Sequence, residues 1–402
     1  MKDKIKIKMD SVLTKKVQIR NVSFEIVDCI FIFCIMALGF AIRFSLRHIE
    51  SGDWTGSLTE WTTAMRQNGT IHILGQDFGS NYNSPYLYIL YVICQTHTNF
   101  SDMYFIKLVS VFFDYLCSFA VFFTILRLTG SKNKAIFAFS AVLLAPTVFL
   151  NSAAWSQCDS IYVFFVLMSF YFILTEKSGY SLLFMGIAFS FKLQAVFFLP
   201  FLLIMWLKDR VKTIHFLLIP FVYFLSILPM RFLGRSFGSL IGVYAGLTDF
   251  YSDLTMSYPN IYALIESNEI TKYLSGAGTF LTVAFLGCTA YYIYKKKFRL
   301  TSSFIITLAL FSVSVTVYTL PHMHERYGYM IDLISIIYGF HRMKKIWMAI
   351  GFQMVSLIAY TPYLLKSEIV PLWLVSVFYL VLIILTGRDL FCQIKENETV
   401  SA

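Results

Sequence analysis

Polar and charged residues that could do acid–base chemistry gather between Ile49 and Leu87, in a chain that is otherwise strongly apolar. Asp53 follows Gly52, which lets the backbone turn sharply directly after the first hydrophobic segment. A carboxylate held there can act as a general base that removes a proton from a hydroxyl group. We therefore predict that Asp53 is a catalytic base, with Asp159 and Asp77 as alternatives.

Four further polar motifs lie between hydrophobic segments. They are Asn81-Tyr82-Asn83-Ser84-Pro85-Tyr86, Trp155-Ser156-Gln157-Cys158-Asp159-Ser160, Phe191-Lys192-Leu193-Gln194 and His322-Met323-His324-Glu325-Arg326-Tyr327. Their cations and hydrogen-bonding groups are the types that bind phosphate and sugar hydroxyls. We expect the motifs to form one site with Asp53, if the intervening segments bring them to the same face of a membrane.

The composition indicates an integral membrane protein with many spans. Hydrophobic residues make up 57% of the chain and charged residues only 14%, and the mean hydropathy is +0.67. A soluble domain is nearer a quarter charged. Because the apolar segments recur throughout, a soluble enzyme with a single anchor is excluded. The net charge of +10 comes from short basic clusters between apolar runs, which is typical of topology determinants and not of nucleic-acid binding.

We predict an all-α, polytopic fold with about twelve transmembrane helices. The expected spans are 24–46, 102–127, 135–150, 161–174, 181–192, 193–207, 216–234, 274–294, 301–321, 329–340, 346–365 and 370–387. The pair 181–192 and 193–207 is short and could instead form a re-entrant hairpin. Asp114 lies near the middle of its span, where a carboxylate has either a functional role or a polar partner on another helix.

The lysines and arginines predict the orientation. Basic clusters fall on alternate loops, so both termini should be cytoplasmic and the loops 47–101, 151–160, 235–273, 322–328 and 366–369 extracytoplasmic. The domain organisation is then a basic cytoplasmic tail (1–23), a transmembrane catalytic module (24–387, with the outer loop 47–101 catalytic) and a cytoplasmic tail (388–402). Two stretches of loop 47–101, WTTAMRQNG and SPYLYILYVICQ, are expected to form interfacial helices.

The motifs resemble those of a known family. Gly52-Asp53, followed by Glu60-Trp61 and a Tyr82-x-x-Pro85 turn, resembles the first lumenal loop of the dolichyl-phosphate-glucose glucosyltransferases of asparagine-linked glycosylation. Phe191-Lys192 followed by Gln194 is similar to the Phe-Lys-Gln stretch of that family, and His324-Glu325-Arg326 resembles its His-Glu-Lys. Two departures are Asn83-Ser84-Pro85 in place of Tyr-Pro-Pro, and Arg326 in place of lysine. The wider resemblance is to the GT-C superfamily, which includes mannosyltransferases.

This resemblance implies a helical GT-C module that transfers a sugar from a polyprenyl-phosphate donor, with inversion. Since a polyprenyl phosphate is a good leaving group, such a transfer needs a base but no acid. We predict that the donor phosphate is bound by Lys192, Arg326, His324, Arg231 and Arg235. We predict that the sugar or acceptor is bound by Glu60, Tyr82, Asn83, Gln157, Asp159 and Gln194.

No cofactor is expected. The seven cysteines show no zinc-like or disulfide spacing, and Asp102, His324 and Glu325 lack the spacing of a divalent cation site, so we expect no metal. The Ile-, Lys- and Phe-rich composition resembles that of a low-GC bacterium, in which the donor would be an undecaprenyl-phosphate sugar and the acceptor a cell-envelope glycan.

Two other classes of protein remain open. One is a lipid-linked-sugar flippase or another secondary transporter, although such proteins usually show internal repeats and sites near the midplane. The other is a non-catalytic partner in an envelope assembly, which would not need Asp53.

Overall fold

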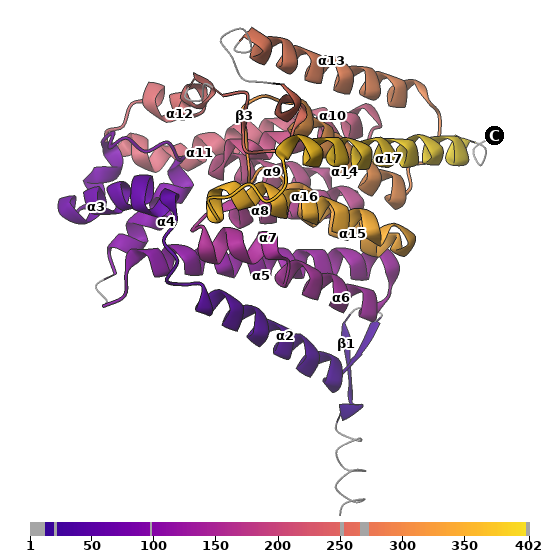
Figure 1. Cartoon of the computed structure of the whole chain (residues 1–402), viewed down its shortest axis with the longest axis horizontal. Coiled ribbons are helices and arrows are strands. Elements are labelled where there is room, and N and C mark those ends of the chain that lie inside the picture. The colour runs from indigo at the N-terminus through magenta and orange to yellow at the C-terminus, as the bar shows by residue number, and fades with distance from the viewer. Residues whose placement is uncertain (1–12, 20–21, 97–98, 250–252, 266–272, 399–402) are drawn as a thin grey trace, which may run out of the picture.

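The computed structural model describes residues 13–19, 22–96, 99–249, 253–265 and 273–398. Most of this part of the chain is helical (Figure 1). The α-helices are α2 (Ile26–Ser45), α3 (Thr59–Asn68), α4 (Ser84–Cys94), α5 (Asp102–Thr129), α6 (Lys132–Leu143), α7 (Pro146–Phe149), α8 (Asp159–Leu174), α9 (Ser178–Phe191), α10 (Leu199–Leu207), α11 (Leu218–Phe232), α12 (Phe237–Asp249), α13 (Leu274–Lys295), α14 (Ser302–Thr319), α15 (Tyr329–His341), α16 (Ile346–Leu364) and α17 (Leu372–Glu398).

Short irregular helices and strands connect them. Two π-helical turns, η1 (Trp54–Leu58) and η3 (Leu150–Ala154), precede α3 and follow α7, and 3-10 turns cover Ile71–Gly75, Leu193–Phe198, Thr213–Leu217, Ile261–Leu264 and Met343–Lys345. Strands β1 (Lys16–Ile19) and β2 (Val22–Glu25) form an antiparallel hairpin before α2. Strands β3 (Thr255–Met256) and β4 (Met323–His324) pair in parallel and fasten the loop after α12 to the loop before α15.

Six described helices are long and apolar enough to cross a membrane. They are Ile26–Ser45, Asp102–Thr129, Thr213–Phe232, Leu274–Lys295, Ser302–Thr319 and Leu372–Glu398. A seventh span results if Lys132–Leu143 and Pro146–Ala154, bent by 44°, count as one. The other expected spans coincide with α8, α9, α10 with its preceding 3-10 turn, α15 and α16. The count of about twelve therefore stays a prediction, whereas the helical, apolar character is confirmed.

The helices form a bundle around α14 and α15, whose residues are almost all buried. Around them α5 packs on α6 and α8, α8 on α9, α9 on α11, and α17 on α14 and α16. Helices α2 and α13 lie at opposite edges of the bundle (Figure 1) and expose apolar side chains such as Phe33 and Phe280. Such faces suit contact with lipid tails.

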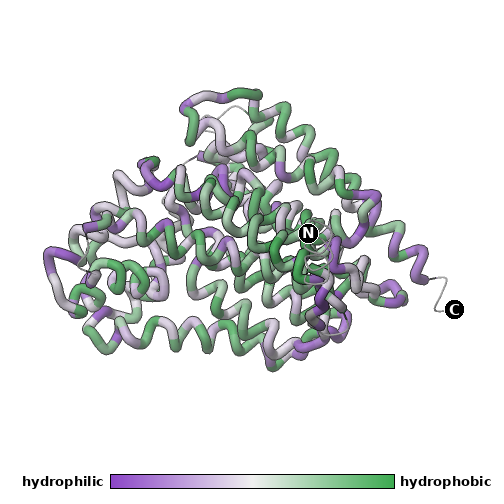
Figure 2. The backbone as a smooth tube through the Cα atoms, turned by 90° about the horizontal axis from the view of Figure 1, so that it is seen from below, coloured by the Kyte–Doolittle hydropathy of each residue, from purple (hydrophilic) through white to green (hydrophobic). Residues whose placement is uncertain are grey.

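The two ends of the bundle carry different parts of the chain. Helices α3, α4 and α12 lie at one end, while β1 and the C-terminal end of α17 lie at the other (Figure 1). Hydrophilic residues gather mostly at these ends, with hydrophobic segments between them (Figure 2). The two helices expected in loop 47–101 are thus present as α3 and α4. Helix α17 runs on to Glu398, so the chain stays helical through most of the predicted C-terminal tail.

Local sequence explains the longest helix. Helix α5 begins after Ser101, whose hydroxyl accepts a hydrogen bond from the Met103 N–H at 3.3 Å and caps the first turn. It ends at Gly130, which has a φ of 64° and adopts the left-handed conformation at little steric cost. Ser131 then caps α6 in the same way. This Gly-Ser turn lets the two helices pack side by side.

The Asp114 carboxylate has a polar partner inside the bundle. Arg43 of α2 donates from Nε to Asp114 Oδ2 at 2.8 Å, and both side chains are fully buried. Ser152 of η3 donates to the same oxygen at 2.6 Å, and Tyr329 of α15 donates to Oδ1 at 3.3 Å. Arg43 Nη1 also donates to the Leu143 carbonyl at 3.0 Å. Asp114 therefore joins four elements, which favours the structural interpretation of this residue.

Candidate functional site

Asp53 lies at the start of η1, just beyond the end of α2. Its backbone N–H donates to the Tyr363 hydroxyl at 2.8 Å. The same hydroxyl would lie 2.8 Å from a Cβ atom at position 52, so glycine there makes room for Tyr363. We predicted Gly52 for a sharp turn, but this close approach supplies the stronger physical reason for glycine.

The two carboxylate oxygens of Asp53 have different surroundings. Trp155 donates from Nε1 to Oδ2 at 2.6 Å, and Gln157 donates from Nε2 to the same oxygen. Within the described residues no protein group donates a hydrogen bond to Oδ1. The side chain is half-buried. One oxygen thus fixes the orientation of the carboxylate and the other is left to accept a proton.

The segment that carries both donors has an unusual backbone. It follows the π-helical turn η3, and Ser156, between Trp155 and Gln157, has a φ of 66°. This left-handed conformation is unfavourable for a residue other than glycine, and it turns the two neighbouring side chains toward the same carboxylate. Tyr363 stacks on the Trp155 ring, with centroids 4.2 Å apart and planes at 12°, which further fixes the indole.

A buried ion pair adjoins this segment. Helix α9 ends where the backbone of Lys192 becomes extended (φ −152°, ψ 136°). There Lys192 Nζ lies 2.5 Å from Asp159 Oδ1, and Asn151 donates to Asp159 Oδ2 at 2.9 Å. Lys192 also donates to Gln157 Oε1 at 3.4 Å. The lysine charge is therefore already paired with a carboxylate of the protein.

Tyr82 completes the contacts of Gln157. Its hydroxyl donates to Gln157 Oε1 at 3.1 Å, and Lys192 Nζ lies 5.4 Å from the centre of its ring. The amide of Gln157 thus links Tyr82 and Lys192 on one side to Asp53 on the other. Four separate stretches of the sequence meet here, as the motifs predicted.

Arg326 brings a second cation to the cluster. Its guanidinium lies 3.8 Å from both Asp159 Oδ2 and Glu325 Oε1, and 5.7 Å from the Trp155 ring centre. Burial opposes its charge, but the carboxylates of Asp53 and Glu325 outweigh burial and raise the pKa of Arg326 well above its usual range. The buried Nε makes no hydrogen bond in the described part of the chain. An anionic ligand would satisfy this donor.

His324 lies beside this cation. Burial and the Arg326 charge lower the pKa of the imidazole, although Glu325, 3.5 Å away, acts in the opposite direction. A neutral ring at pH 7 can donate one hydrogen bond but adds no positive charge.

Other predicted site residues lie apart from Asp53. Arg231 is exposed and its guanidinium lies 5.3 Å from the centre of the Phe237 ring. Arg235 lies 3.6 Å from Asp77, whose side chain is 64% exposed. Glu60 is exposed on α3. Arg231, Asp77 and Glu60 are at the surface and Arg235 is buried beside Asp77, and none of the four contacts the cluster among the described interactions.

Asn83 and Gln194 support the cluster from its edges. Asn83 is buried and donates to the Ser190 carbonyl at 3.0 Å and to the Tyr244 hydroxyl at 3.2 Å. Gln194 donates to the Tyr327 hydroxyl at 2.7 Å, which ties the Lys192 segment to the loop that carries Arg326. Both residues thus position neighbours of the cluster and are not themselves bonded to Asp53.

Sequence patterns did not identify three residues that contribute hydrogen bonds to the site: Trp155, Asn151 and Tyr363. Trp155 belongs to a motif that had been singled out, and an indole N–H next to a polar loop was a usable signal. Nothing marks Tyr363 in the sequence, because it comes from the end of α16, far along the chain. Among the described residues, no group of three or more His, Cys, Asp or Glu side chains is arranged to hold a metal ion.

No family model matches this chain, and no curated protein matches it either. The function is therefore inferred from the residues and geometry of the site.

Proposed function

We propose that this protein is a membrane glycosyltransferase of the GT-C type. It would transfer a hexose-type sugar, with inversion, from a polyprenyl-phosphate donor to a cell-envelope glycan or a lipid-linked acceptor on the extracytoplasmic face. The observation that carries the proposal is the Asp53 carboxylate, held through Oδ2 by Trp155 and Gln157 while Oδ1 has no protein donor in the described residues.

In the proposed reaction Asp53 Oδ1 takes the proton from an acceptor hydroxyl. The acceptor oxygen then forms a bond to the anomeric carbon as the bond from that carbon to the phosphate oxygen breaks. The electron pair stays on the polyprenyl phosphate, so no acid is needed on the leaving-group side. The Arg326 guanidinium is the group we assign to this phosphate, because its Nε donor is buried and has no hydrogen bond in the described structure.

The charge balance of the cluster refines the assignment of cations. Asp53, Asp159 and Glu325 supply three carboxylates against Lys192 and Arg326, and Lys192 is bound to Asp159. Removing Lys192 would leave a buried carboxylate without its partner and would destabilise the fold. Arg326 is therefore the better residue with which to test phosphate binding.

A deletion strain tests the function directly. Lipid extracts of cells lacking the protein should accumulate a polyprenyl-phosphate sugar, and their wall glycans should lack the corresponding residue. Mass spectrometry of both fractions, with the gene restored as control, measures the two changes. Unchanged lipids together with unchanged glycans would refute the proposal.

We predict that Arg326→Gln weakens donor use. Loss of a charge-assisted hydrogen bond to phosphate costs about 1.5–3 kcal/mol, which corresponds to roughly 10–100-fold in the KM for the donor. Arg231→Gln is the matched control, because that arginine is exposed on Phe237 and away from the cluster. Equal donor KM values for the two variants would remove Arg326 from the phosphate site.

The proposed topology has its own test. We expect Asn68→Cys, an exposed position at the end of α3, to react with a membrane-impermeant maleimide in intact cells. The positions of the basic clusters predict that this end of the bundle lies outside. Reaction only after permeabilisation would reverse the orientation and with it the location of the site.

A lipid-linked-sugar flippase is the second candidate. It is favoured by the bent α6–α7 segment, since transporters place broken helices within the membrane. Its loss would strand the lipid-linked sugar on the cytoplasmic side, whereas loss of the transferase leaves it outside. Periodate added to intact deletion cells oxidises only the outer population and so distinguishes the two.

A further inference from the structure

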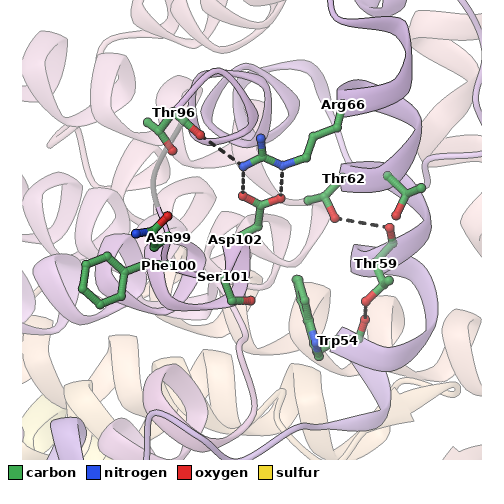
Figure 3. Close-up of a pocket in the computed structure, with 10 residues that line it drawn as sticks. Trp54, Thr59, Thr62, Arg66, Thr96, Asn99, Phe100, Ser101 and Asp102 are labelled. Carbon is green, nitrogen blue, oxygen red and sulfur yellow. Dashed lines mark hydrogen bonds and ion pairs between the residues drawn. The ribbon is translucent and has the colours of Figure 1, made fainter.

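A second polar feature lies beside the Asp53 cluster. A cavity of about 640 Å³ opens between η1, α3 and the start of α5 (Figure 3). It is lined by Trp54, Thr59, Thr62, Thr63, Arg66, Thr96, Asn99, Phe100, Ser101 and Asp102. None of these residues belongs to the ion-paired cluster, so the cavity is a separate compartment. One of its lining residues, Trp54, directly follows Asp53 in the chain.

The charges in this cavity cancel each other. Arg66 binds Asp102 in a two-point contact, with Nε 2.7 Å from Oδ2 and Nη2 2.5 Å from Oδ1, as Figure 3 shows. Arg66 Nη2 also donates to the Thr96 carbonyl at 3.3 Å. A phosphate would compete with Asp102 for the same guanidinium edge. The cavity is therefore suited to a neutral ligand, in contrast to the buried Arg326.

The remaining lining combines an aromatic ring with small polar groups. The half-buried Trp54 indole offers an apolar surface, and its Nε1 makes no hydrogen bond to the described residues. Threonine and asparagine side chains around it can donate and accept hydrogen bonds. A hexose presents the complementary chemistry: C–H faces that pack on an aromatic ring and a rim of hydroxyl groups.

We infer that this cavity binds a neutral sugar residue of the acceptor. The inference rests on the proposed glycosyl transfer and specifies its acceptor side. Trp54 is the residue directly after Asp53, so the cavity is lined by the chain neighbour of the proposed base. The donor phosphate is then assigned to Arg326 and the acceptor sugar to the cavity at Trp54.

Protection from labelling tests binding without relying on catalysis. Thr63→Cys places a thiol in the cavity wall, and Gln67→Cys places one on the same helix outside it. The full-length protein in nanodiscs is labelled with a maleimide in the presence of glucose, mannose, galactose or N-acetylglucosamine, and the labelled peptides are quantified. At least one sugar should slow labelling at position 63 saturably, by about tenfold at ten times its Kd. Labelling at position 67 should not change.

Trp54 variants complete the test. Trp54→Ala should abolish protection at position 63 and raise the acceptor KM by on the order of tenfold, while Trp54→Phe should keep part of both. Gel filtration of each variant checks folding. If Trp54→Ala does not fold, Trp54→Phe is used to test the loss of protection and the rise in acceptor KM. Absence of protection by all four sugars, or equal protection at both positions, would overturn the inference.

The outcomes separate this inference from the proposed function. If a sugar protects position 63 but the protein transfers no sugar, the cavity is a saccharide site and the proposed transferase function is wrong. Transfer with an unchanged acceptor KM in Trp54→Phe and Trp54→Ala would retain the transferase and refute the acceptor site.

Discussion

Asp53→Asn should yield a well-folded protein that binds donor but transfers sugar about 10²–10⁴-fold more slowly than the wild type. The asparagine Oδ1 can still accept hydrogen bonds from Trp155 and Gln157, so the neighbouring side chains keep their geometry. Only the proton acceptor is lost. Transfer is measured as incorporation of sugar from a polyprenyl-phosphate donor in membranes, and by rescue of wall glycans in a deletion strain.

Asp77→Asn is the matched control for this variant. Asp77 lies in the same loop, is 64% exposed and pairs with Arg235, so its loss should leave the rate near that of the wild type. Normal wall glycans in a strain that carries only Asp53→Asn would show that Asp53 is not the base. Asp159 would not then be a simple substitute, because its two oxygens are bound to Lys192 and Asn151.

The largest expected effect on stability comes from Arg43→Ala. It leaves the Asp114 carboxylate buried among α2, α5, η3 and α15 without its cation, and loss of one partner from a buried ion pair costs about 3–5 kcal/mol. We expect a clear fall in folded yield and in the thermal midpoint measured in detergent.

Two further variants identify the cause. Arg43→Met combined with Asp114→Asn removes both charges and keeps an acceptor for Ser152, so it should recover most of the lost stability. Lys132→Ala breaks the 2.7 Å pair with Asp28, in which the lysine side chain is 27% exposed, and should lower the thermal midpoint far less than Arg43→Ala does. If the double variant were no more stable than Arg43→Ala, the uncompensated charge would not be the reason for the loss.

Hydropathy predicted the helices better than it predicted their roles. Observed helices coincide with the expected spans, because runs of apolar residues between basic clusters leave few other solutions. The sequence could not decide which of them cross a membrane alone. Helices such as α8 and α9 are apolar but have 16 and 14 residues, and α9 ends at Phe191, next to the boundary between the expected spans 181–192 and 193–207.

The candidate site was predictable in its members and less so in their pairing. Asp53, Gln157, Lys192 and Arg326 were all proposed from short motifs, and they lie in one cluster. That Lys192 binds Asp159 depends on the extended backbone at the end of α9, which no local pattern indicates. Arg235 was assigned to phosphate from its charge alone, yet it lies beside Asp77. The position of a loop residue depends on tertiary contacts, which the local sequence does not reveal.

The hydrogen bonds of the cluster fix the orientation of the Gln157 amide. The Gln157 oxygen accepts hydrogen bonds from Tyr82 and Lys192, and the Gln157 nitrogen donates one to Asp53. If the amide were flipped, its NH2 group would face two donors and its oxygen would face the Asp53 carboxylate. Hydrogen bonds arranged head to tail polarise one another. A ligand that drew Lys192 or Tyr82 away would therefore weaken the hydrogen bond that Gln157 donates to Asp53. The orientation of the Asp53 carboxylate thus depends, through one amide group, on Tyr82 before α4 and Lys192 after α9, neither of which bonds to it among the described interactions.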